Sequence, residues 1–260
     1  MALKAQSVIL YGLEVNATNS SIDFVAVSLG PTLQASVAFG FYSLSSLATA
    51  IATAMNQADP ANTYSVTVDR TIAGGSQNRV TIETDGTYLD LLFGTGPRAA
   101  SSIAALIGFG PTDQTGATDY TGMTTAGTIL ISTLNGYSYL GPTKIKKVFG
   151  AVNVSAIGEK EAVVFAVQTF LQVQFKYEPE SKYESEWLPF VTWAIQQKLF
   201  EFTPEITSPN TYYEVTLEST NADGKGLGST FTEMLPQFPD LYDSGMLKMR
   251  QRILVGGFSP

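Results

Sequence analysis

The segment 89–122 is the strongest constraint that this sequence places on its fold. Apolar residues alternate over 89–93, which is the spacing of a short strand. A Gly-Thr-Gly-Pro turn follows, and Pro97 stands where the first turn of a helix tolerates it. The next residues predict one or two helical turns over 98–107, ended by Gly108 as a C-terminal cap. A strand that turns tightly into so short a helix favours a fold with many short elements.

The chain has 260 residues and contains neither Cys nor His. Disulfide bonds, thiolate metal sites and cysteine nucleophiles are therefore excluded, as are catalytic triads that contain histidine. We expect a protein that is not an enzyme and that holds no metal and no cofactor.

The chain has few charged residues and a negative net charge. It carries 15 Lys and Arg against 23 Asp and Glu, a formal net charge of −8. Nucleic-acid binding needs a basic face that displaces phosphate counterions, so we expect no nucleic-acid partner. Charged residues make up only 15% of the chain, against about 25% in an ordinary soluble domain, which predicts an apolar surface that contacts partners. No window approaches the ~18 uninterrupted apolar residues of a membrane span.

The length favours two domains, since one domain holds roughly 150 residues. We place the first at 1–145. It is expected to be β-rich with one main helix over 44–57, capped by Ser43, whose apolar residues recur at helical spacing. The predicted strands and strand pairs of this domain lie at 7–13, 22–29, 33–41, 64–68 with 80–82, 89–93 and 127–134.

The two domains are expected to join through a turn-rich linker marked by Asn135-Gly136 and Gly141-Pro142. Its lysines, Lys144, Lys146 and Lys147, either stay solvated or dock on the acidic remainder of the chain. The second domain, 146–260, is predicted to be β-rich and sandwich- or barrel-like, with one main helix over 183–198. Its strands are expected at 168–177, 200–203, 212–219 and 247–254. The fold class is therefore α+β, predominantly β.

Two glycine-containing motifs imitate ligand sites. The run 94–99 matches G-x-G-x-x-A, with Asp113 downstream, but the neighbouring hairpin and the short helix favour a structural turn over a dinucleotide site. The run 219–224 imitates half of a calcium loop, yet Thr230 stands where such a loop needs a bidentate Glu. We expect an exposed loop there.

Carboxylates and aromatic side chains gather around the predicted second helix. Paired carboxylates are all that a glycoside hydrolase needs, but glutamates in a first helical turn are explained by the helix dipole. Aromatic residues at helical spacing are more often core than a sugar-stacking platform. The residues concerned are Glu178, Glu180, Glu184 and Glu186, and Trp187, Phe190, Trp193, Phe200 and Phe202.

The predicted last strand carries a ladder of positive charge. Lys248, Arg250 and Arg252 alternate with mostly apolar residues, which gives one basic face and one apolar face. Such a face is either simply solvated or docks on an acidic neighbour in a ring of subunits. These three residues are the candidate interface.

Two parts of the chain resemble structural proteins of bacteriophage particles. The first part runs from the helix at Leu44 to Gly122, and the second lies in the C-terminal half. The matching segments are the Ala- and Leu-rich helix that ends in Asn56, Asn62–Arg70, Asn78–Glu83, Leu91–Gly96, Ser102–Phe109 and Thr115–Gly122, followed by Phe175–Pro179, Trp187–Phe202 and Tyr212–Thr220.

The resemblance implies a virion component of the tail, baseplate or neck, made in the host cytoplasm and present as one copy in a symmetric ring. Its partners would be further copies of itself and other tail proteins, and its role would be to link the tail tube to the adhesion apparatus. A carbohydrate-binding or receptor-contacting adhesin module is the alternative, which exposed aromatic side chains in the second half would favour. A hydrolase that uses two glutamates is a third possibility and would need a carboxylate pair in a cleft.

Overall fold

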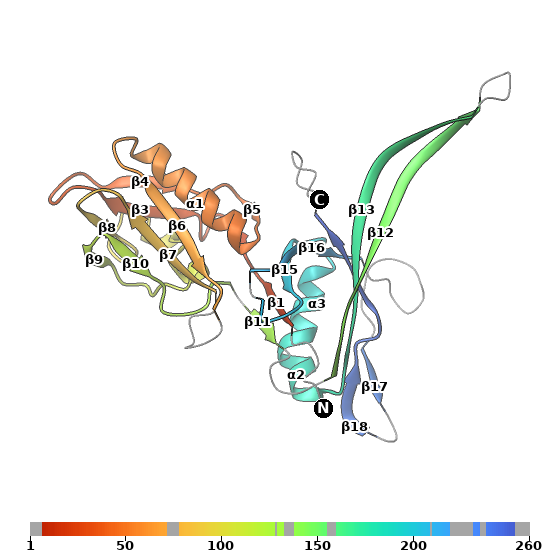
Figure 1. Cartoon of the computed structure of the whole chain (residues 1–260). Coiled ribbons are helices and arrows are strands. Elements are labelled where there is room, and N and C mark those ends of the chain that lie inside the picture. Colours follow the sequence, from red (N-terminus) through yellow and green to blue (C-terminus); the bar gives the residue numbers. More distant parts are fainter. Residues whose placement is uncertain are drawn as a thin grey trace.

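The computed structural model is mostly β, with 43% of residues in strands and 19% in helices, which confirms the predicted α+β, predominantly β class. Figure 1 shows an N-terminal part beside a large sheet, from which one long hairpin projects. The structure describes residues 7–71, 78–127, 129–132, 138–154, 160–208, 210–218, 231–234 and 238–252.

The N-terminal part packs one helix, α1, on small antiparallel sheets around a first hydrophobic core. The strand pairs at 64–69 with 79–84 confirm the predicted hairpin, although its predicted turn at Gly74-Gly75 lies outside the described residues. The strands are β2 (Glu14–Val15), β3 (Ser21–Val25), β4 (Leu33–Ser36), β5 (Gly40–Phe41), β6 (Tyr64–Asp69), β7 (Arg79–Thr84), β8 (Leu89–Leu91), β9 (Gln114–Ala117) and β10 (Asp119–Thr121).

The helix α1 (Leu44–Ala58) forms where the sequence predicts it. Ser43 and Ser46 form a reciprocal capping box that satisfies backbone N–H groups at the helix start. The buried residues Leu44, Leu47 and Ile51 follow the helical period and pack on the first core. The segment 98–107 is a different case, because it forms two short 3₁₀ turns, Ala99–Ser101 and Ala104–Ile107, and no regular α-helix.

The second core lies under a seven-stranded sheet with the order β11-β1-β15-β16-β19-β13-β12. Among the described residues this sheet is open, with β11 and β12 at its edges, and helices cover one face of it. Its strands are β1 (Val8–Tyr11), β11 (Ile129–Ser132), β12 (Ser138–Val154), β13 (Lys160–Lys176), β15 (Phe200–Thr203), β16 (Tyr213–Leu217) and β19 (Leu247–Gln251).

Strand β1 connects the two parts of the molecule. It lies between β11 and β15, and all four of its residues are buried. Successive side chains on a strand point to opposite faces, and accordingly Leu10 packs in the first core while Ile9 and Tyr11 pack in the second. Strand β1 is therefore shared between both cores, and the division at residue 145 stays a prediction.

The second helical segment covers one face of the sheet. It comprises α2 (Glu180–Lys182), a π-helical turn η4 (Tyr183–Trp187) and α3 (Leu188–Ala194). Pro189 has no N–H to donate, and the wider π turn just before it accommodates this loss. Trp187, Phe190 and Ala194 from this segment pack on the sheet.

The predicted linker around 141–147 is instead part of a strand. β12 and β13 pair over 17 residues each, with a register shift between Leu140 and Thr143 that takes up Gly141 and Pro142. Proline is tolerated at a bulge on an edge strand, because no ladder hydrogen bond is lost there. A small three-stranded sheet lies at the end of the hairpin opposite to its tip, where β13 ends. Its strands are β14 (Glu178–Pro179), β18 (Phe238–Asp243) and β17 (Thr232–Met234).

Candidate functional site

Of the three predicted interface residues, Lys248 and Arg250 lie at alternate positions of β19, and Arg252 directly follows the strand. The Arg250 Nε atom pairs with Glu218 Oε1 at 2.9 Å, and the Lys248 Nζ atom lies 4.6 Å from the centre of the Phe170 ring. The Arg252 side chain is exposed and forms no hydrogen bond or ion pair with the described residues. The basic face is thus partly balanced within the chain, and Arg252 is its available cation.

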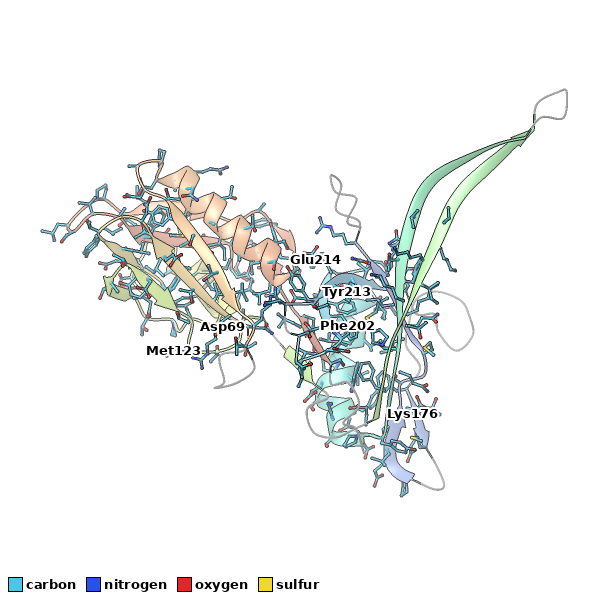
Figure 2. All side chains as sticks on the ribbon, in the orientation of Figure 1. Asp69, Met123, Lys176, Phe202, Tyr213 and Glu214 are labelled. Carbon is cyan, nitrogen blue, oxygen red and sulfur yellow. The ribbon has the colours of Figure 1, made fainter. Side chains whose placement is uncertain are left out.

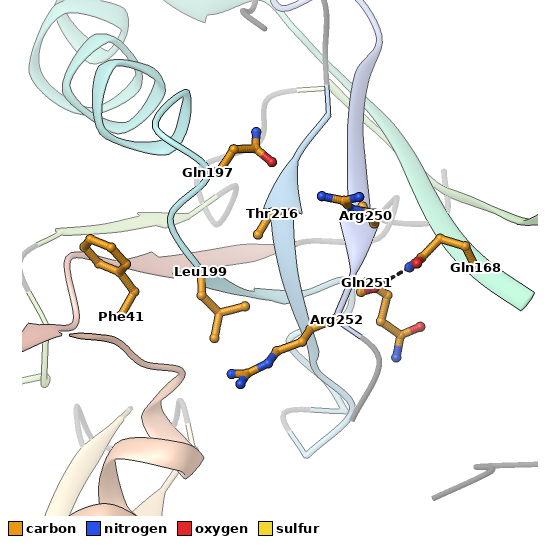
Figure 3. A pocket seen from close by; sticks show the side chains of 8 residues that line it. All are labelled: Phe41, Gln168, Gln197, Leu199, Thr216, Arg250, Gln251 and Arg252. Atoms are coloured by element: carbon orange, nitrogen blue, oxygen red, sulfur yellow. Dashed lines mark hydrogen bonds between the residues drawn. The ribbon is translucent and has the colours of Figure 1, made fainter. Parts of the chain in front are cut away.

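Arg250 and Arg252 line a hollow of about 430 Å³ beside β19 (Figure 3). Phe41 from the N-terminal part and Leu199 supply apolar surface, and Gln168 donates to the Gln251 carbonyl oxygen at 2.5 Å. The sequence did not predict this hollow, because it forms between segments far apart in the chain. Its lining residues are Phe41, Gln168, Gln197, Leu199, Thr216, Arg250, Gln251 and Arg252.

The hairpin β12–β13 projects away from the rest of the molecule (Figure 1). In the part of the chain that the structure describes, β13 pairs with β19 over Phe170–Val173, and β12 is an edge strand of the sheet. Val148 and Val167 lie directly opposite each other, and their side chains are 63% and 49% exposed. The hairpin therefore offers a long unpaired strand edge with apolar side chains beside it.

Three exposed lysines, Lys144, Lys146 and Lys147, lie along β12. None of them forms an ion pair with a carboxylate in the part of the chain that the structure describes. Two make contacts with aromatic rings: Lys144 with Tyr213 at 5.3 Å and Lys147 with Phe170 at 5.5 Å. Of the two alternatives for these lysines, docking on carboxylates of the same chain is therefore not seen among the described residues.

The opposite end of the C-terminal part is acidic. Glu180 and Glu184 on the helical segment and Glu233 on β17 surround the phenol of Tyr242 on β18. Burial raises the pKa of Tyr242, and the negative charges of these glutamates raise it further. Asp240 is exposed on the same strand, and its backbone N–H donates to Glu233 at 3.4 Å. Sequence analysis singled out Glu180 and Glu184 but missed Glu233 and Asp240, which come together only through the fold.

A polar network joins the N-terminal part to the sheet. The guanidinium of Arg70, which follows β6, donates to both carboxylate oxygens of Glu201 on β15, and to Ser45 Oγ at 2.9 Å. The same guanidinium lies 4.0 Å from the centre of the Tyr212 ring. Ser43, at the start of α1, donates to Glu214 on β16. Figure 2 shows Glu214 on the side of the sheet that is next to α1. These contacts fix how the two parts are held together.

The segment 94–99 is a structural turn. The Asp113 carboxylate accepts hydrogen bonds from the backbone N–H groups of Gly94 and Thr95 at 2.6 and 3.0 Å, and from the Thr95 hydroxyl at 2.5 Å. These are the amides that would face a phosphate in a dinucleotide site, and the protein's own carboxylate occupies them. The preceding strand β8 is also antiparallel to both its neighbours.

Burial explains Glu178 and the aromatic side chains around the second helix as parts of the protein interior. Glu178 is completely buried, where it accepts from the Trp187 indole at 3.1 Å and pairs with Lys182 at 3.0 Å. Trp187, Phe190, Phe200 and Phe202 are core residues, as predicted, and Trp193 is half-buried against them, so this set offers no exposed sugar-stacking platform.

The imitation of a calcium loop at 219–224 lies outside the described residues. Within the described residues, no three acidic side chains converge as ligands for a metal ion, and no helix has the length and apolar character needed to cross a membrane. Models of known protein families give no match to this chain, and neither do curated protein sequences.

Proposed function

We propose that this chain is a non-enzymatic structural protein of a bacteriophage tail or baseplate. It assembles as a symmetric ring and links the tail tube to the adhesion apparatus, in contact with other tail proteins of the virion. The β12–β13 hairpin carries this proposal, and the resemblance of two parts of the sequence to phage structural proteins supports it.

The hairpin is difficult to explain in an isolated subunit. A strand of 17 residues spans about 55 Å, and in the direction of the hairpin tip from Phe170 no third described strand pairs with it. Two-stranded ribbons are marginally stable in water, and long unpaired edges with apolar side chains pair with other chains. Repetition of one such contact from copy to copy produces a closed ring when the rotation closes.

Shortening the hairpin tests this function. Val148 and Val167 lie opposite each other, so residues 149–166 can be replaced by an Asn-Gly turn that joins the two strands. Val148 and Val167, where the new turn would join the strands, are exposed, so the shortened chain should fold and unfold at nearly the wild-type temperature. We expect wild-type protein to sediment as a closed oligomer and the shortened chain to sediment as a monomer. A shortened chain that assembles like wild type would contradict the proposal.

A further inference from the structure

The hairpin differs in charge from the rest of the chain. Residues 138–176 contain five Lys and two Glu, whereas the remaining residues contain ten Lys or Arg and 21 Asp or Glu. An extended, positively charged arm thus projects from an acidic body. A second copy of this chain presents a surface of the complementary sign to that arm.

Three lysines on the arm have no carboxylate partner among the described residues. Lys176, Lys182 and Lys198 each pair with a carboxylate, and so do Arg70, Arg98 and Arg250. Lys144, Lys146 and Lys147, by contrast, are exposed and have no carboxylate within ion-pair distance among the described residues. Lys144 and Lys146 lie on one face of β12 and Lys147 on the other, so this part of the edge strand is positively charged on both faces.

The acidic end of the C-terminal part carries carboxylates that lack a cation partner among the described residues. Glu180, Glu184, Glu233 and Asp240 form no ion pair with any cation in the described part of the chain. Glu180, Glu184 and Asp240 are exposed, and Glu233 is half-buried. Two unbalanced surfaces of opposite sign therefore lie on the same subunit, one along β12 and one around Tyr242.

We propose that Lys144, Lys146 and Lys147 on β12 of one copy bind the acidic end formed by Glu180, Glu184, Glu233 and Asp240 of a second copy. This inference rests on the proposed ring and adds a charged contact at 144–147 to the strand-edge contact of residues 149–166; assembly needs both contacts. The two surfaces differ, so the contact is head-to-tail, and each copy keeps one free surface until the ring closes. The exposed Val148, next to Lys147 on β12, adds apolar area at the edge of the contact.

Edge-strand lysines have a second known role, which is to prevent strand-to-strand association. The two roles predict opposite results for neutral substitutions. If the lysines only prevent strand-to-strand association, the variant K144Q/K146Q/K147Q should associate more strongly than wild type. If they bind the acidic end of a second copy, this variant should associate about tenfold more weakly. Each exposed ion pair contributes up to about fivefold in affinity, and the variant removes three positive charges.

Charge reversal with rescue is the decisive experiment. The measured quantity is the association constant from sedimentation velocity at low and at high salt. We expect K144E/K146E/K147E to abolish assembly, and the further substitutions E180K/E184K in the same chain to restore it. The matched control is E83K/D119K, which restores the same amount of charge at two exposed carboxylates on the N-terminal part and should not restore assembly.

The outcomes separate this inference from the proposed function. A wild-type chain that assembles, together with a charge-reversed variant that assembles equally well, overturns the proposed contact and leaves the ring in place. Rescue by E83K/D119K as strong as by E180K/E184K also overturns it, because net charge alone would then explain the effect. A wild-type chain that stays monomeric at every concentration contradicts both proposals.

Discussion

Arg70 and Glu201, 131 residues apart in the chain, form a buried ion pair between the N-terminal part and the seven-stranded sheet. Their side chains are only 6% and 2% exposed. Burial and the nearby Glu214 raise the pKa of Glu201, while Arg70 opposes that rise. The charge on Arg70 is what makes an ionised carboxylate tolerable at this position.

Removing one member of this pair should be costly. We expect Arg70→Ala to lower the free energy of unfolding by about 3–5 kcal/mol, because Glu201 is then left buried without its partner. Urea denaturation followed by fluorescence measures this loss. The paired variant R70M/E201L removes both charges and should recover most of the lost stability; if it is as unstable as Arg70→Ala, the ion pair is not the cause.

The cap of α1 offers a second test. Ser43 accepts a hydrogen bond from the Ser46 N–H and donates one to Glu214. We therefore expect Ser43→Ala to lower the free energy of unfolding by about 1–2 kcal/mol. Thr49→Ala is the matched control, since that exposed hydroxyl only donates to the Ser45 carbonyl within the helix. Equal unfolding midpoints for the two variants would exclude a role of the cap in joining the two parts.

Asp113 predicts a specific dependence on pH. Burial by itself raises the pKa of Asp113, but hydrogen bonds from Thr95 and Gly94 outweigh it and hold the pKa below its usual value. The contribution of the Asp113 carboxylate to folding stability is therefore complete above the ordinary Asp pKa of about 4. It is lost as the pH falls through the lowered pKa that Asp113 has in the folded protein. Asp113→Asn should remove part of this acid sensitivity, which thermal unfolding between pH 7 and pH 2.5 measures. An unchanged pH profile would contradict the assignment.

Local sequence patterns predicted the elements whose stability is local. α1 was predicted because its cap and its apolar period both lie within 43–58, and β15 was predicted with its bounds at 200–203. The segment 98–107 was predicted as helical turns ended by Gly108, and this glycine does adopt the left-handed conformation at φ 82°.

Non-local pairing explains what the sequence did not reveal. Gly141-Pro142 indicates a turn, but pairing with β13 keeps this segment in an edge strand and confines the irregularity to a bulge. Similarly, nothing near Val8–Tyr11 predicts that this strand lies beside β15, about 190 residues later in the chain. The acidic end and the hollow beside β19 depend on the same kind of contact, so their members could not be grouped from sequence spacing.

Electron microscopy of the purified chain, at a concentration where it sediments as an oligomer, tests the central claim most directly. The account predicts closed rings in which β12 of each subunit lies against the acidic end of the next. Particles that are single two-part subunits at every concentration would contradict it.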